Sequence, residues 1–183
     1  TSLIISLLLV ASLWTTTQAQ PKQPTSNGYT TEYVELGRKT SLLYKPAVVS
    51  EKNAIGVVVM HSNDDYLGFP ANSELSKRGY TVLATVPAEG DIMDEKILNI
   101  KRAVEYLRNM PGINKVLLLG HSGGATVMTA YQMLAEQGVD VLKTKIFSDY
   151  TANLANLPKA DGMLLLDANY GNAVMRLISL DPN

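Results

Sequence analysis

The stretch VLLLGHSGGA at residues 116–125 joins an apolar run to a glycine-rich turn with the pattern G-x-S-x-G. The apolar run at 116–119 predicts a buried strand, and the apolar spacing after Ser122 predicts a helix. A sharp turn between a strand and a helix is strained, so glycine is expected at positions 120 and 124, where any Cβ would collide with the neighbouring strand and helix. The pattern therefore predicts that the Ser122 hydroxyl is exposed above a sheet.

Three further apolar runs predict strands that are covered on both faces, as in a parallel sheet flanked by helices. Helical patterns alternate with these runs, which predicts an α/β fold with a doubly wound, mostly parallel sheet and right-handed crossovers. Two short segments around Gly37 predict a hairpin at one edge of this sheet. The long segment at 139–158 is expected to be a cap or insertion near a site. The expected strands are 31–36, 40–44, 55–60, 80–86, 116–119 and 163–166, and the expected helices are 72–78, 93–110 and 122–137.

The composition is that of one globular domain. The chain has 183 residues, of which 46% are hydrophobic and 18% charged, and this argues against a disordered chain or a coiled coil. A formal net charge of −1 argues against nucleic acid or an anionic membrane surface as a partner. The absence of cysteine excludes disulfides, thiolate zinc sites and a cysteine nucleophile, and two histidines are too few for a histidine-rich metal site. We therefore expect neither a metal nor an organic cofactor.

The first 29 residues are expected to precede the folded domain. Residues 3–14 form an apolar block shorter than the ~20 residues of a membrane-spanning helix, and Thr17-Gln18-Ala19 approximates a small-residue cleavage site. Residues 1–19 are therefore interpreted as a signal peptide with an incomplete N-terminus, which implies a secreted or periplasmic protein. The alternative is a membrane anchor, although no stable anchor is expected. Residues 20–29 predict a flexible lead-in, and residues 30–183 the domain itself.

The strand, the G-x-S-x-G turn and the helix resemble the α/β-hydrolase family, and the resemblance covers residues 31–181. A second match is VVVMHSN at residues 57–63, which lies where that family typically carries an oxyanion loop containing His-Gly. This chain has Ser62 where the family's glycine would be expected. The resemblance implies the fold of that family, apparently truncated after the sixth strand, with the C-terminal part missing.

The same resemblance assigns roles to individual residues. It implies that Ser122 is the nucleophile of an acyl-enzyme, and that the backbone N–H groups of Asn63 and Gly123 stabilise the oxyanion. The N–H of Ser62 is the alternative to that of Asn63, because a residue other than glycine at position 62 can change the shape of the turn. The helix after Ser122 also directs its N-terminal dipole toward the developing negative charge.

A serine nucleophile needs a general base, and in this family the base is a histidine that follows both the serine and the acid in chain order. No histidine follows His121 in this sequence. We therefore expect the catalytic histidine beyond Asn183. The acid is either Asp167, at the end of the strand at 163–166, or a residue beyond Asn183. Asp167 has a competing role as the cap of the turn at 168–171.

Other residues near these loops have simpler interpretations. His61 is expected to hold its loop by hydrogen bonds, and His121 to point away from Ser122, because adjacent side chains diverge in a sharp turn. Asp64 and Asp65 are expected to be solvated rather than to bind a metal. Three aromatic residues are expected either to line a substrate pocket or to be exposed or packed in the core: Tyr66, Phe69 and Tyr170.

These features predict a serine hydrolase that cleaves an ester or related acyl bond of a small molecule through an acyl-enzyme on Ser122. Two alternatives stay open. The first is an acyltransferase that uses the same serine. The second is a non-catalytic binding protein with the α/β-hydrolase fold, which is suggested by the absent histidine and by Ser62.

Overall fold

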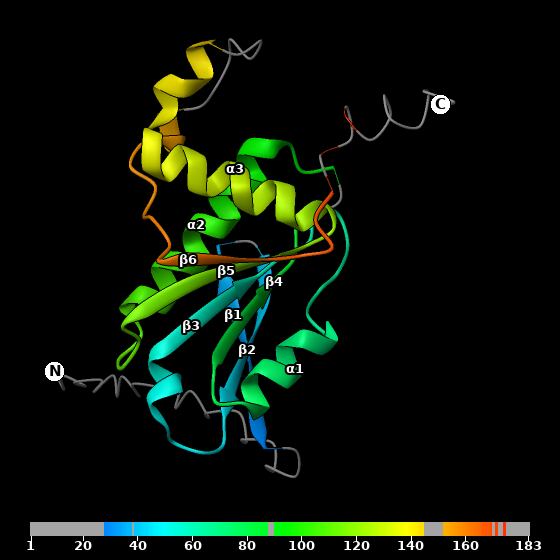
Figure 1. The fold of residues 1–183 in the computed structure, drawn as a ribbon, viewed down its shortest axis with the longest axis vertical. Coiled ribbons are helices and arrows are strands. Elements are labelled where there is room, and N and C mark those ends of the chain that lie inside the picture. Colours follow the sequence, from blue (N-terminus) through cyan, green and yellow to red (C-terminus); the bar gives the residue numbers. More distant parts are fainter. Residues whose placement is uncertain are drawn as a thin grey trace, which may run out of the picture.

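The computed structural model describes residues 28–37, 39–87, 90–144, 152–169, 171 and 174 (Figure 1). The expected signal peptide at 1–19 and the pocket candidate Tyr170 lie outside the described residues, as does most of the expected lead-in. Tyr29, the last residue of that lead-in, already pairs with Pro46 as the first residue of a strand. Within the described residues, no helix combines the length and the apolar character needed to cross a membrane.

Strands and helices alternate along the chain as the sequence predicts. Every predicted strand and helix is present, and its bounds differ from the prediction by two residues at most. The elements are β1 (Tyr29–Leu36), β2 (Lys39–Pro46), the 3-10 helix η1 (Glu51–Ala54), β3 (Ile55–Val59), α1 (Pro70–Lys77), β4 (Thr81–Thr85), α2 (Met93–Asn109), β5 (Lys115–His121), α3 (Gly123–Gln137), the 3-10 helices η2 (Val139–Thr144) and η3 (Ala152–Leu154), and β6 (Gly162–Leu166).

The described strands form one sheet in the order β1-β2-β4-β3-β5-β6. Strands β4, β3, β5 and β6 are parallel, and β1 and β2 are added as an antiparallel hairpin at the β4 edge. The predicted doubly wound, mostly parallel sheet is therefore confirmed. Because β4 and β5 lie on opposite sides of β3, the chain changes its winding direction between β3 and β5. In α/β sheets, ligands bind at the carboxyl ends of the strands at such a switch point.

Helices cover both faces of the sheet, α1 on one face and α2 with α3 on the other (Figure 1). Successive residues at the end of β3 face opposite layers. Val57 and Val59 pack in the cluster that includes Leu75 of α1, whereas Val58, and Met60 directly after the strand, pack with α2 and α3. The predicted core positions of the two long helices are at most 3% exposed, and they are Ile97, Ile100, Val104 and Leu107 of α2 and Val127, Tyr131 and Leu134 of α3.

Hydrogen bonds at both ends of β6 fix its register beside β5. At its start, the Val116 N–H donates to Asp161 Oδ2 over 2.7 Å, and the Asp161 N–H donates back to the Val116 carbonyl over 2.8 Å. Arg108 of α2 also donates to Asp161 over 3.1 Å. At its end, the Ser122 N–H donates to the Leu166 carbonyl over 3.0 Å. The residues that follow β6 are therefore held beside the Ser122 turn.

Candidate active site

The turn between β5 and α3 places Ser122 at φ 51° and ψ −123°. This left-handed conformation is rare for a residue other than glycine and costs of the order of 1–3 kcal/mol. The neighbouring glycines are required by contacts, as the sequence predicts. A Cβ at Gly120 would lie 2.5 Å from Ala125 Cα, and a Cβ at Gly124 would lie 2.3 Å from the Met60 carbonyl oxygen.

The Ser122 hydroxyl is not used to cap the helix. Ser122 occupies the N-cap position of α3, where a serine side chain usually accepts a hydrogen bond from a backbone N–H of the first turn. No such side-chain bond is present at this N-cap. Among the residues that the structure describes, the bonds of Ser122 are made by its backbone: its N–H donates to Leu166 and its carbonyl accepts the Ala125 N–H over 3.1 Å. The strain at Ser122 therefore accompanies a hydroxyl that does not cap its own helix, and strained backbone of this kind clusters at active sites.

The loop at 61–69, which follows β3, lies directly against the start of α3. A Cβ at Gly123 would lie 2.3 Å from Ser62 Oγ, and a Cβ at Gly124 would lie 3.0 Å from His61 Cα. The structure therefore brings together the two segments that carry the predicted oxyanion donors. Of the two residues considered for the loop donor, Ser62 is the one in contact with Gly123.

His61 organises the beginning of this loop. Its Nδ1 accepts the Asn63 N–H over 3.2 Å and the Asp64 N–H over 3.0 Å, so this nitrogen is unprotonated. Burial lowers the pKa of His61 and outweighs the Asp64 carboxylate, whose oxygen is 3.2 Å from Nδ1 and which raises the pKa. A neutral His61 that accepts two backbone N–H groups has the structural role expected from the sequence. The Asn63 N–H is engaged by this bond in the described geometry.

His121 is also engaged. Its Nδ1 is 2.6 Å from the Tyr66 hydroxyl, and its ring is 5.3 Å from that of Phe69. Tyr66 stacks on His61 at 4.6 Å and on Phe69 at 4.5 Å between ring centroids. We refer to His61, Tyr66, Phe69 and His121 as the ring cluster. Tyr66 and Phe69 thus pack against the two histidines beside the Ser122 turn.

Asp167, the acid candidate, directly follows β6. It is exposed and has φ 45°, and the residue before it accepts the Ser122 N–H. The carboxyl end of β6 therefore brings Asp167 to the same edge of the sheet as Ser122.

The sequence pattern does not indicate that Asn169 contacts α3. Its Oδ1 accepts hydrogen bonds from the Thr126 hydroxyl over 3.0 Å and from the Gly171 N–H over 3.1 Å. Its Nδ2 would be 3.8 Å from a Cβ at Gly123. Asn169 thus fastens the chain after β6 to the first turn of α3. An Asn two residues before a Gly is a typical turn signal, but it does not indicate a partner on a distant helix.

Lys96 of α2 is a second residue that the sequence did not indicate. Its ammonium group donates to Asn63 Oδ1 over 2.9 Å. The described residues contain no group of three or more His, Asp or Glu side chains that could hold a metal ion. Asp64 and Asp65 are both exposed, and Asp65 accepts the Leu67 N–H over 2.8 Å.

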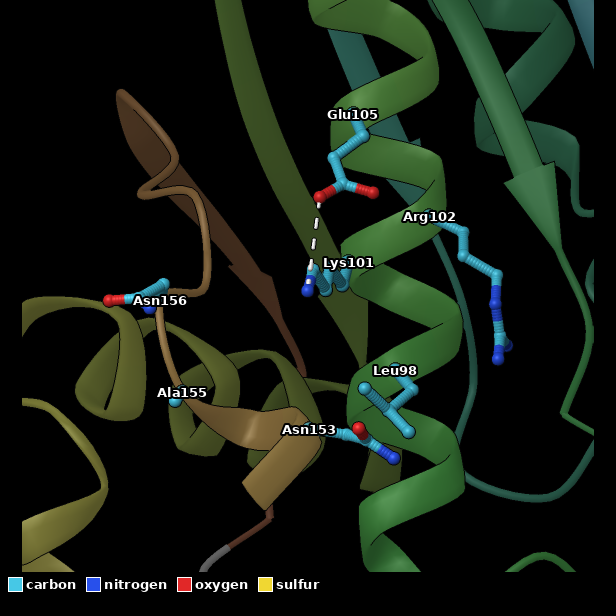
Figure 2. A pocket seen from close by; sticks show the side chains of 7 residues that line it. All are labelled: Leu98, Lys101, Arg102, Glu105, Asn153, Ala155 and Asn156. Carbon is cyan, nitrogen blue, oxygen red and sulfur yellow. Dashed lines mark ion pairs between the residues drawn. The ribbon is translucent and has the colours of Figure 1, made fainter. Parts of the chain in front are cut away.

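A hollow of about 450 Å³ lies between α2 and residues 153–156, at the end of η3 and just after it (Figure 2). None of its lining residues belongs to the loop at 61–69 or to the Ser122 turn. One of its walls carries the ion pair between Lys101 and Glu105, at 4.0 Å on α2. Its lining residues are Leu98, Lys101, Arg102, Glu105, Asn153, Ala155 and Asn156.

No family model matches the sequence, and no curated protein matches it significantly. The structure is nevertheless similar to solved esterases. Esterase B from Lactobacillus rhamnosis, in complex with a tributyrin phosphonate, has a TM-score of 0.60 and 16% identity over 77% of this chain and 49% of its own. EstE7, a hormone-sensitive lipase homologue from a metagenome library, has a TM-score of 0.55 and 16% identity over 79% and 46%. Thermogutta terrifontis esterase 2, phosphonylated by sarin, has a TM-score of 0.55 and 13% identity over 75% and 54%.

These neighbours are α/β-hydrolase fold enzymes, and the chain has the same fold. The chain spans about half the length of these proteins. The sheet order, the winding reversal between β3 and β5, and the strand-turn-helix unit at Ser122 are the features of that fold that the described residues contain.

Proposed function

We propose that the protein is a serine hydrolase that cleaves carboxylic esters, with Ser122 as the nucleophile. The observation that carries this proposal is the strained Ser122 at the switch point of the sheet, whose hydroxyl does not cap α3. Strain of this kind persists when a side chain must be held in a reactive position. The likeness to esterases of the same fold supports the same class of reaction.

In the proposed reaction, Ser122 Oγ attacks the ester carbonyl carbon while a general base takes the hydroxyl proton. The carbonyl π electrons move to oxygen and form a tetrahedral oxyanion, which collapses to an acyl-enzyme and releases the alcohol. Water then attacks the acyl group and releases the acid, so Ser122 is regenerated. The N–H of Gly123, at the first position of α3, would donate to the oxyanion, and the α3 dipole would stabilise its charge.

The second oxyanion donor would come from the loop at 61–69. We propose the N–H of Asn63 for this role, as the resemblance implies, with the N–H of Ser62 as the alternative. The contact between Ser62 and Gly123 favours Ser62, and the Asn63 N–H would first have to leave His61 Nδ1. That bond, at 3.2 Å, is at the upper end of the normal range, and its acceptor also takes the Asp64 N–H, so it should be weaker than an unshared hydrogen bond.

We do not assign the general base to either histidine of the chain. Nδ1 of His61 accepts two backbone N–H groups, so the proton of the neutral ring is on Nε2 and neither ring nitrogen is free to take the Ser122 proton. The His121 ring is held by its Nδ1 bond to Tyr66 and by its contact with Phe69, and it directly precedes Ser122 in a sharp turn where adjacent side chains diverge. Both histidines also contact Tyr66 in the ring cluster.

The proposed substrates are small-molecule esters. Two of the similar structures hold phosphonates, one derived from tributyrin and one from sarin. A phosphonate bound to a serine mimics the tetrahedral intermediate of ester hydrolysis. These two structures support short-chain acyl esters as the first substrates to test.

The test is hydrolysis of p-nitrophenyl butyrate by the full-length wild-type protein and by Ser122→Ala. The matched control is Ser73→Ala, whose hydroxyl donates to the Pro70 carbonyl within α1. The proposal expects activity in the wild type and in the control, and a loss of at least about 10³-fold in Ser122→Ala. Equal activity in Ser122→Ala would overturn it. Product formation only with an alcohol acceptor would instead favour an acyltransferase, and ester binding without turnover would favour a binding protein.

A further inference from the structure

Tyr66 links α1 to the end of β5, two elements that are far apart in the sequence. Its carbonyl accepts hydrogen bonds from Asn72 Nδ2 over 2.8 Å and from the Phe69 N–H over 3.2 Å, so its backbone is fixed to the start of α1. Its hydroxyl lies 2.6 Å from His121 Nδ1 on β5. One residue of the loop at 61–69 is therefore bonded both to the helix on its own side of the sheet and to the end of a central strand.

The two rings that flank Tyr66 restrict the position of its hydroxyl. The ring stacks on His61 with an interplanar angle of 14° and on Phe69 with an angle of 27°. Stacking against two rings leaves the Tyr66 ring little freedom to rotate away from His121. Burial raises the pKa of the Tyr66 hydroxyl, which keeps it protonated at neutral pH.

The bond between Tyr66 and His121 lies next to the segments that would hold the oxyanion. His121 is the residue before Ser122, and Ser62, on the same loop as Tyr66, touches Gly123. The loop and the turn are packed so closely at that contact that a Cβ on Gly123 would overlap Ser62 Oγ. A change in the separation of the two segments therefore changes the spacing between their backbone N–H groups.

We propose that Tyr66 is a positioning residue, and that its hydrogen bond to His121 sets the distance between the loop at 61–69 and the Ser122 turn. This inference rests on the proposed function of Ser122. An oxyanion site requires its donors to be about 3 Å from one oxygen, and a misplacement of about 1 Å can cost up to about 100-fold in rate. The oxyanion exists only in the transition state and the intermediate, so this positioning acts on kcat and not on KM.

The first test compares Tyr66→Phe with Tyr44→Phe in the full-length protein. Tyr66→Phe keeps the ring stack and removes the bond to His121. Tyr44→Phe removes a hydroxyl bond of the same length, 2.6 Å, from the Leu67 carbonyl, which Asn72 also holds. The two variants therefore lose the same kind of bond from the same loop, but only Tyr66 reaches β5.

We expect kcat of Tyr66→Phe to fall about tenfold with an unchanged KM, and kcat of Tyr44→Phe to stay within about twofold of the wild type. Titration of reactive Ser122 with a fluorophosphonate normalises each rate to folded protein. An unchanged kcat in Tyr66→Phe, or the same loss in both variants, would overturn the proposal.

The second test pairs Tyr66→Phe with two changes at His121. His121→Leu removes the hydrogen-bond partner of Tyr66 and should lower kcat as much as Tyr66→Phe, and the double variant should be no slower than either. His121→Asn offers a polar group near the place of Nδ1 and should recover most of the rate. Losses that multiply in the double variant would contradict coupling between the two residues. A wild-type protein without Ser122-dependent hydrolysis would overturn the proposed function together with this inference, whereas an active wild type with an unaffected Tyr66→Phe would overturn the inference alone.

Discussion

Replacement of Gly124 by Ala tests whether stability and activity depend on the close contact between α3 and the end of β3. The added Cβ would lie 2.3 Å from the Met60 carbonyl oxygen and 3.0 Å from His61 Cα. Both are backbone atoms, so no side-chain rotation relieves the overlap. To reach a tolerable separation, α3 and the end of β3 must move apart by about 0.7 Å in a close-packed interior.

This displacement determines how much stability the variant loses. Overpacking a core typically costs about 1–3 kcal/mol, and a clash with rigid backbone should reach the upper end, about 3 kcal/mol. For a domain of this size, that corresponds to a decrease in Tm of about 6–12 °C. The same movement separates Ser122 from the loop at 61–69, so esterase activity should also fall, by at least about tenfold.

The assay combines thermal unfolding, followed by circular dichroism, with ester hydrolysis at a temperature where the variant is folded. The matched control is Gly68→Ala in the neighbouring loop, because a Cβ there would have no atom within 4 Å. Its free energy of unfolding should change by no more than about 0.5 kcal/mol. Equal stability of Gly124→Ala and Gly68→Ala would refute the claim that the backbone contact with Met60 and His61 requires glycine at position 124.

Three other predictions concern single residues of the site and its support. Ser122→Gly should be more stable than Ser122→Ala by about 1 kcal/mol in urea unfolding, because relief of the strain at φ 51° exceeds the entropic cost of glycine; the reverse order would contradict the strain. Burial lowers the pKa of His61, so the stability that its neutral ring contributes is complete above the ordinary pKa of 6.5 and is lost as the pH falls through the folded-state pKa. His61→Asn should therefore lose less unfolding free energy than the wild type between pH 7.5 and 5, and an unchanged pH dependence would contradict this. Asn99→Ala should lower the free energy of unfolding by about 1–3 kcal/mol, because it leaves the Thr85 hydroxyl and the Val86 carbonyl without their buried donor; a change below about 0.5 kcal/mol in chemical denaturation would count against this.

Most of the fold could be predicted from local patterns. Apolar runs without alternation identified the central strands, and the spacing of Ile97, Ile100, Val104 and Leu107 identified the buried face of α2. Strand β5 is longer than its apolar run because Gly120 and His121 pair with Leu165 and Leu166 of β6. That extension depends on a neighbouring strand and leaves no mark in the sequence of β5 itself.

The site could be predicted only where one segment carries its own signal. The positions of Ser122, Gly120 and Gly124 follow from the steric demands of a strand-turn-helix unit. The contacts of Tyr66 with His121 join residues 55 positions apart, and those of Asn169 with Thr126 join residues 43 apart. Such contacts depend on how loops meet at the edge of the sheet, which residue type and periodicity do not encode.

The most direct test of the account is covalent labelling of the full-length protein with a fluorophosphonate, followed by peptide mapping in a mass spectrometer. The account predicts one equivalent of label on Ser122, no label in Ser122→Ala, and loss of ester hydrolysis in proportion to labelling. Labelling of another serine, or full ester hydrolysis by a protein whose Ser122 remains unmodified, would contradict the assignment of Ser122 as the nucleophile.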